Sequence, residues 1–113
     1  MNKEQQELLD EVYENYRNSY PDAEKTFQYE KNTFEIRRMT KDEFIDMIKS
    51  DVEYGRRWGL KIEERELSWE ERETYGYEIN IDGILTEEWA DKLRLPTKLI
   101  TITYNNERIE SYE

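Results

Sequence analysis

The chain has 113 residues and a formal net charge of −11 at pH 7, with 40% of its residues charged and 35% hydrophobic. This length predicts one domain with a modest core, and three tryptophans, nine tyrosines and three phenylalanines indicate that aromatic side chains supply much of that core. The sequence contains no histidine and no cysteine, which excludes Ser-His-Asp and Cys-His catalysis, disulfides, and zinc sites built on these residues. We therefore expect a protein that is not an enzyme, with no catalytic residues, no cofactor and no metal.

The charge is unevenly distributed along the chain. Residues 31–61 carry eight bases against six acids, whereas both flanking segments are acidic. Phosphate contacts need clustered lysine and arginine, so we expect no direct binding to nucleic acid and favour a protein partner with a cationic surface. No apolar run approaches the length of a membrane span, and the N-terminus is acidic and amphipathic rather than a secretory signal. We expect no membrane partner and a cytoplasmic location.

The first predicted element is an amphipathic helix over residues 3–19, which ends before Pro21. Its apolar stripe contains Leu8, Leu9, Val12, Tyr13, Tyr16 and Tyr20. The stripe has two interpretations: it packs on its own domain, as most amphipathic helices do, or residues 1–20 form a partner-binding arm on a domain of residues 21–113. In the second interpretation Tyr13, Tyr16 and Tyr20 contact the partner.

Residues 26–38 favour a β-hairpin. Phe27 alternates with Tyr29, and Phe34 with Ile36, on either side of Lys31 and Asn32, which is the period of a strand. A helix that begins at Pro21 and runs to residue 32 is the competing interpretation, because proline suits the first helical position.

A central helix is predicted over residues 41–57. Thr40 and Glu43 have the spacing of a capping box, so the helix begins at Lys41. Ser50 and Glu53 repeat this spacing, and the helix can therefore break there and start again.

The end of this helix supplies a second candidate contact patch. Arg56 and Arg57 suit a helix C-terminus, where the dipole favours cations, and Gly59 suits the left-handed conformation that closes a helix. Trp58 lies between these arginines and Gly59, and we expect it to anchor the helix on a sheet. Arg56, Arg57 and Trp58, which Arg37 and Arg38 can join, form the only basic and aromatic cluster. We single out Arg56, Arg57 and Trp58 as partner-binding, although the dipole explains the arginines equally well.

The next segment alternates short strands and helices. A strand is predicted from Leu60 to Leu67, and Ser68 with Glu71 forms a third capping box, which starts a helix at Trp69 that closes near Gly76. A strand is expected next, through Tyr77, Ile79 and Ile81, with a turn at Asp82 and Gly83. Thr86 then caps a short helix that runs to Lys92.

Two motifs in this acidic region have an ordinary explanation. Residues 78–89 resemble a calcium-binding loop, but Glu78 occupies the first position and Trp89 the twelfth, where a bidentate glutamate is required. Adjacent carboxylates such as those of Glu63 and Glu64 are expected by chance among 28 acidic residues. We therefore assign neither a calcium site nor a catalytic carboxylate pair.

The C-terminus predicts a second hairpin. Residues 98–104 and 107–112 flank Asn105 and Asn106, and asparagine tolerates the positive φ angles of a tight turn. A two-residue loop would pair Ile102 with Ile109 and Leu99 with Tyr112. With the helices above, this hairpin predicts an α+β fold with a mainly antiparallel sheet that ends in the hairpin over 98–112.

Two segments also resemble known sequences. WGLKIEERELSWEER at 58–72 and PTKLITITYNNERIESYE at 96–113 are similar to the recurring ends of small uncharacterised proteins of tailed bacteriophages. The motifs carry no known catalytic residue, so the resemblance implies an origin rather than a mechanism.

Together these observations lead to two principal hypotheses, and a carboxylate-metal enzyme is a third, weaker one. The first is a non-enzymatic protein-interaction module, a virion or assembly component of a phage, which binds a viral or host protein or forms an oligomer in the host cytoplasm or the virion. The alternative is an acidic DNA mimic that inhibits a DNA-binding enzyme of the host, which requires the acidic charge to converge on one face.

Overall fold

The computed structural model describes residues 1–19, 25–29, 31–79 and 83–113. In chain order the elements are α1 (Lys3–Ser19), β1 (Lys25–Tyr29), β2 (Asn32–Ile36), α2 (Lys41–Ser50), α3 (Val52–Arg57), β3 (Leu60–Glu66), α4 (Trp69–Glu78), α5 (Glu87–Lys92), β4 (Lys98–Tyr104) and β5 (Glu107–Tyr112). Strands β3, β4 and β5 form one antiparallel sheet, while β1 and β2 pair as a separate hairpin. This architecture confirms the predicted α+β class.

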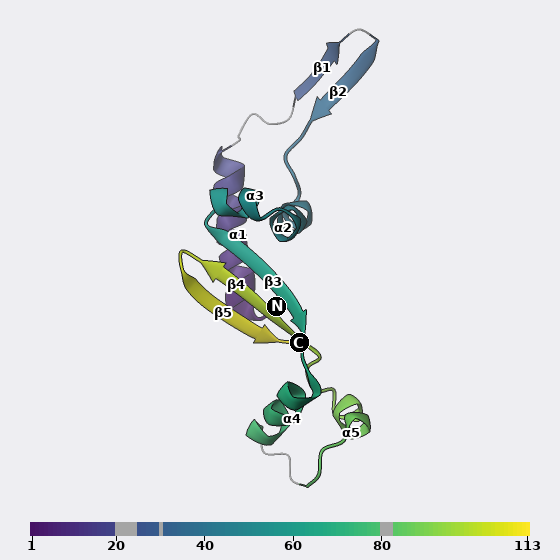
Figure 1. Cartoon of the computed structure of the whole chain (residues 1–113). Helices are drawn as coiled ribbons and strands as arrows, with labels where there is room; N and C mark the ends of the chain where they lie inside the picture. The colour runs from purple at the N-terminus through teal and green to yellow at the C-terminus, as the bar shows by residue number, and fades with distance from the viewer. Residues whose placement is uncertain (20–24, 30, 80–82) are drawn as a thin grey trace.

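The molecule is elongated and has three parts. Its extents are 69 × 31 × 21 Å and its radius of gyration is 19.7 Å, whereas a compact domain of this length would have a radius of about 13 Å. The central body contains α1, α2, α3 and the three-stranded sheet (Figure 1). The hairpin, residues 25–36, extends from one end of the body, and the lobe, residues 68–96 with α4 and α5, extends from the other.

Strand β4, which is rich in β-branched residues, is the central strand of the sheet. Asn105 and Asn106 make the turn to β5 with φ angles of 47° and 70°. This turn sets the predicted register, in which Ile102 is opposite Ile109 and Leu99 is opposite Tyr112. On the other side of β4, Ile102 is opposite Ile62 of β3.

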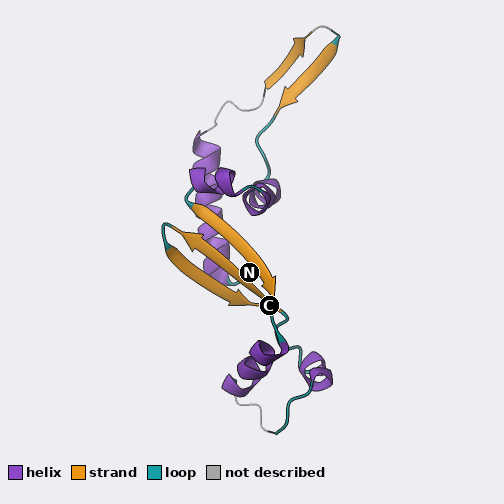
Figure 2. Cartoon of the chain, in the orientation of Figure 1, coloured by secondary structure: helices purple, strands orange, loops and turns teal. Residues whose placement is uncertain are grey.

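Helix α1 lies across one face of this sheet (Figure 2). Its apolar stripe joins α2 and the sheet in one core of buried side chains: Leu9, Val12, Tyr16, Phe44, Ile48, Leu60, Ile62 and Ile102. The stripe therefore packs on its own domain, and α1 is an integral part of the body.

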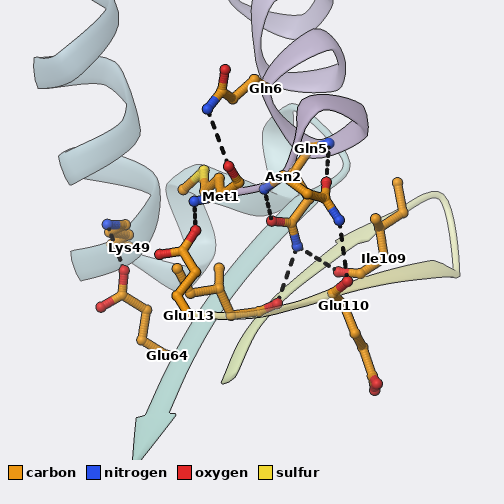
Figure 3. A network of polar contacts seen from close by, with 10 residues as sticks. Met1, Asn2, Gln5, Gln6, Lys49, Glu64, Ile109, Glu110 and Glu113 are labelled. Carbon is orange, nitrogen blue, oxygen red and sulfur yellow. Dashed lines mark hydrogen bonds and ion pairs between the residues drawn. The ribbon is translucent and has the colours of Figure 1, made fainter. Parts of the chain in front are cut away.

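The start of α1 is attached to the sheet by hydrogen bonds (Figure 3). Asn2 Oδ1 accepts a hydrogen bond from the Gln5 N–H at 2.8 Å, and Gln5 Oε1 accepts one from the Asn2 N–H at 3.3 Å, which is a reciprocal capping box. Gln5 is fully buried, and its Nε2 donates to the carbonyls of Ile100 (3.1 Å) and Ile109 (2.8 Å). One amide thus connects α1 to two neighbouring strands.

The central helix starts as predicted but is divided. Thr40 and Glu43 form the expected capping box. The break predicted at Ser50 is confirmed, since α2 ends at Ser50 and a short second helix, α3, ends at Arg57. Only the predicted cap is corrected, because Asp51 rather than Ser50 caps α3. The Asp51 carboxylate accepts hydrogen bonds from the N–H groups of Glu53 and Tyr54 (3.0 and 3.2 Å), and a carboxylate is at least as good a cap as a hydroxyl.

The hairpin prediction for residues 26–38 is confirmed. Strands β1 and β2 pair with Phe27 opposite Phe34 and Lys25 opposite Ile36. The competing helix over residues 21–32 is therefore wrong for residues 25–29, which are a strand.

The lobe differs from the sequence prediction in its first helix. Ser68 and Glu71 form the predicted capping box, but α4 continues through Gly76 to Glu78. A glycine inside a helix costs only about 1 kcal/mol, so Gly76 does not end α4, and the strand predicted at Tyr77 and Ile79 is wrong. Residues 80–82 of that strand and turn lie outside the described residues.

The second helix of the lobe is as predicted. Thr86 caps α5, and its Oγ1 accepts a hydrogen bond from the Trp89 N–H at 3.3 Å. None of the helices in the described ranges combines the length and hydropathy needed to cross a membrane.

Candidate interaction surfaces

The tyrosines predicted as partner contacts have different environments. Tyr16 is 6% exposed, and its ring stacks on Phe44 with 4.8 Å between the ring centroids. Tyr16 is therefore a core residue, and the expectation that it contacts a partner is corrected. Tyr13 is half-buried beside it, at 5.8 Å between ring centroids. Tyr20 lies outside the described residues.

Tyr13 and Tyr16 together hold the segment that follows the hairpin. The Tyr13 hydroxyl donates to the carbonyl oxygen of Met39 at 2.8 Å, and the Tyr16 hydroxyl accepts from the Met39 N–H at 2.9 Å. Lys41, two residues further on, forms an ion pair with Asp10 of α1. These three contacts, which we name the tyrosine clamp, attach the base of the hairpin to α1.

The second predicted patch, Arg56, Arg57 and Trp58, is only partly exposed to solvent. Arg56 and Arg57 are exposed in the last turn of α3, as the helix dipole favours, and Arg56 also pairs with Glu53 at 2.9 Å. Trp58 is half-buried in the core, edge-on to Phe44 with 5.8 Å between ring centroids. The structure thus confirms Trp58 as an anchor of α3, and only the two arginines face solvent.

Sequence analysis missed a repeated clamp at two helix starts. The pattern Arg-x-x-Thr/Ser-x-x-Glu occurs at residues 37–43 and 65–71, and in both cases the arginine forms a bidentate pair with the capping-box glutamate. Hydrogen bonds from Arg37, and then from Thr40, lower the pKa of Glu43 to about 2. Hydrogen bonds from Arg65, and then from Ser68, lower the pKa of Glu71 to about 2. Each clamp fixes the direction in which a helix leaves the preceding segment.

The hairpin is amphipathic by register. Because residues alternate between the faces of a strand, the pairing of Phe27 with Phe34 and of Lys25 with Ile36 places four apolar residues on one face, at its centre and on both strands. This face carries Phe27, Tyr29, Phe34 and Ile36, together with the polar residues Lys25 and Asn32. The other face carries only polar residues: Thr26, Gln28, Thr33 and Glu35. In the part of the chain that the structure describes, no helix or strand covers either face (Figure 1). The sequence shows the alternation of apolar and polar residues in the hairpin, but it does not show that no other helix or strand lies over the hairpin.

The lobe also presents apolar side chains to solvent. Among the described residues of the lobe, three buried ones form a small apolar core: Leu85, Ala90 and Leu95. Five large apolar side chains of the lobe are exposed: Tyr77 (46%), Ile79 (49%), Ile84 (91%), Trp89 (55%) and Leu93 (50%). Because single exposed apolar residues are ordinary on a protein surface, the lobe ranks behind the hairpin as a candidate contact surface.

The face of the sheet opposite α1 is polar and mixed in charge. The register aligns Glu63, Thr101 and Glu110 in one row across the strands, with Lys61, Thr103 and Arg108 in the next. A third row holds Arg65, Leu99 and Tyr112, and Leu99 and Thr101 are buried at the centre of the face. The charged side chains of the two edge strands therefore include both signs. This face gives the acidic-mimic hypothesis no support.

One open groove, of about 310 Å³, lies between α4 and β5. It is lined by Glu70, Glu71, Thr74, Tyr75, Glu78 and Tyr112. Glu71 is already bound by Arg65, and the described residues contain no group of three or more acids placed to hold a metal ion. The groove thus separates the body from the lobe without a built ligand site.

Comparisons with protein-family models, with curated proteins and with solved structures returned no match.

Proposed function

We propose that this chain is a non-enzymatic protein-interaction module and that the hairpin is its docking element. The sequence resemblance to small phage proteins further supports a role as a virion or assembly component, in the host cytoplasm or the virion. Its partner is a viral or host protein.

The observation that carries this proposal is the amphipathic register of the hairpin, over which no other helix or strand of the described chain lies (Figure 1). An isolated two-stranded hairpin is at best marginally stable in water, and this one has four apolar residues on a single face by register. A protein surface that covers this face would stabilise the hairpin and gain affinity from the apolar contact. The tyrosine clamp at Met39 supports the same role, because it fixes the base from which the hairpin extends.

The experiment is an affinity capture from phage-infected bacteria with the tagged full-length chain. Phe34→Asp places a charge on the apolar face, and Thr33→Asp places the same charge on the polar face as its matched control. We expect the retained proteins to be lost with Phe34→Asp and kept with Thr33→Asp, while both variants melt like the parent protein. Equal retention by both variants would contradict the proposal.

A second candidate function is the acidic DNA mimic, and one observation favours it. Glu4, Glu7, Glu11 and Glu14 are exposed on α1 at helical spacing, so that they form one acidic stripe. A decoy of this kind should compete with DNA for a nuclease and lose that competition in Glu7→Gln/Glu11→Gln. An unchanged nuclease rate at any concentration of the chain would eliminate this candidate.

A further inference from the structure

The three-stranded sheet has two edge strands, β3 and β5, and β5 leaves its outer edge open. Strand β3 packs beside α2 and α3. In the part of the chain that the structure describes, no helix or strand runs along the outer edge of β5 (Figures 1 and 2). Such an edge presents a row of backbone N–H and C=O groups that can pair with a strand of another chain. The edge of β5 is therefore a place where the sheet can be extended.

The turn before β5 determines which of its residues face this edge. The turn has two residues with positive φ, and in such a hairpin the flanking pair, here Tyr104 and Glu107, exchanges both backbone hydrogen bonds. The alternate residues of β5 therefore direct their N–H and C=O groups away from β4: Arg108, Glu110 and Tyr112. The hydrogen bond from Asn2 Nδ2 to the carbonyl oxygen of Glu110, at 3.3 Å, agrees with this direction. Among the described residues, no backbone carbonyl outside the sheet accepts from the N–H groups of these three residues.

The charges along the open edge complement those of a second copy of the same strand. When two β5 strands pair antiparallel about Ile109, Arg108 of each copy lies opposite Glu110 of the other, and the two Ile109 residues lie opposite each other. Opposite charges directly across two strands stabilise a sheet, and like charges destabilise it. A pairing centred on Arg108 or on Glu110 would place two like charges opposite each other. The edge is thus complementary to itself in one register.

The two charged side chains are accessible for this contact. Arg108 and Glu110 form an ion pair with each other at 3.4 Å, with their side chains 66% and 42% exposed. An exposed pair of this kind contributes little to stability. Both side chains can therefore turn to a second copy at little cost.

We propose that the chain forms a symmetric dimer in which the β5 strands of two copies pair antiparallel about Ile109. The two sheets then join into one continuous antiparallel sheet. Both copies contribute the same surface, so the contact is closed and does not propagate beyond a dimer. The hairpin lies away from this edge (Figure 1). The dimer therefore goes beyond the proposed function and does not depend on it.

The test is sedimentation velocity on the full-length protein over a range of concentrations. We expect the parent protein to pass from monomer to dimer and to form nothing larger. Glu110→Arg places two arginines opposite each other at each pair, and Arg108→Glu places two glutamates there, so each should weaken the dimer by about tenfold or more. Glu63→Arg makes the same change of charge at an exposed residue of β3, outside the contact, and should leave the dimer close to that of the parent.

Mixing the two variants tests the register. In a pair of one Arg108→Glu copy and one Glu110→Arg copy, the new glutamate lies opposite the new arginine, and the native residues also face each other. An equimolar mixture should therefore form a dimer with one copy of each. The double variant Arg108→Glu/Glu110→Arg should dimerise with itself for the same reason. Thermal melting like that of the parent shows that the variants are folded, and a mixture that stays monomeric while the parent dimerises would overturn this register.

Amide hydrogen exchange read by NMR shows whether the backbone makes the contact. The N–H groups of Arg108 and Glu110 should exchange quickly in the dilute protein and slowly in the dimer, whereas that of Ile109, which bonds to β4, should be slow in both. A dimer that leaves these two amides unprotected would overturn the pairing of the edges. A parent protein that is monomeric at every concentration would overturn the dimer, including the case in which a captured protein protects the same two amides.

Discussion

At the residue scale, Gln5 shows how one polar side chain can fix the position of a helix. Its buried Nε2 donates to carbonyls of both β4 and β5, and its Oε1 accepts at the start of its own helix. We predict that Gln5→Ala lowers the free energy of unfolding by about 1–3 kcal/mol, since it removes both hydrogen bonds from a fully buried amide to the sheet. Gln6→Ala, at the exposed neighbouring amide, should change it by less than about 0.5 kcal/mol. Urea denaturation measures both, and equal effects would contradict the role of Gln5.

The two bidentate pairs of an arginine with a capping-box glutamate, Arg37 with Glu43 and Arg65 with Glu71, predict that stability depends on pH. The pKa of Glu71 is lowered from 4.5 to about 2 in the folded chain, so its stabilising effect is complete above pH 4.5 and is lost as the pH falls towards 2. Glu71→Gln should therefore be less stable than the parent protein at neutral pH, and this difference should shrink as the pH falls from 4.5 to 2.

The matched control for this effect is Glu70→Gln, one residue earlier in α4. Because Glu70 shares the charge and the helix turn but not the bidentate arginine, its substitution should show a much smaller loss at neutral pH. Thermal melts of the three proteins between pH 2 and 7 make the comparison. A loss in Glu71→Gln that does not change with pH would contradict the clamp.

At the scale of elements, α3 and β3 meet at a glycine. A Cβ on Gly55 would lie 2.5 Å from the carbonyl oxygen of Leu60, which belongs to the backbone and cannot move aside like a flexible side chain. Alanine normally stabilises a helix relative to glycine by about 1 kcal/mol, but here we expect Gly55→Ala to destabilise the protein by about 1–3 kcal/mol. Arg57→Ala on the exposed face of α3 is the control. A more stable Gly55→Ala variant in urea denaturation would contradict this packing.

The tyrosine clamp predicts a coupling between α1 and the hairpin. Tyr13→Phe/Tyr16→Phe keeps both rings in place but removes the two hydrogen bonds to Met39, at a cost of about 1 kcal/mol per bond. The base of the hairpin then loses its fixed direction, so we expect weaker binding of the captured partner by a chain that is still folded. Binding as tight as that of the parent protein would show that the clamp serves stability alone.

The sequence predicted those elements whose signals are local. The capping boxes at Thr40 and Ser68, the cap at Thr86 and the turn at Asn105 each depend on a few neighbouring residues. Two predicted helix boundaries were wrong because a competing local interaction was stronger. Asp51 displaced Ser50 as the cap of α3, and Gly76 remained inside α4 although glycine often ends a helix.

At the scale of the whole molecule, local patterns were insufficient because they do not say what covers an apolar face. The stripe of α1 and the alternation of the hairpin are both amphipathic, yet Leu9 and Val12 are buried in the body while the hairpin extends away from it. The tyrosines looked like a contact surface for the same reason. Only the arrangement of α1 on the sheet shows that Tyr16 belongs to the core and that the candidate docking face is elsewhere.

The central claim is that the hairpin is covered by a partner when the protein functions. Hydrogen–deuterium exchange of the full chain tests this directly, first at low concentration and then with the captured partner. We predict that amides of residues 25–36 exchange quickly in the dilute protein and slowly in the complex, while those of β4 are protected in both. Protection that appears only on α1 or around Arg56, with no change in the hairpin, would contradict the account.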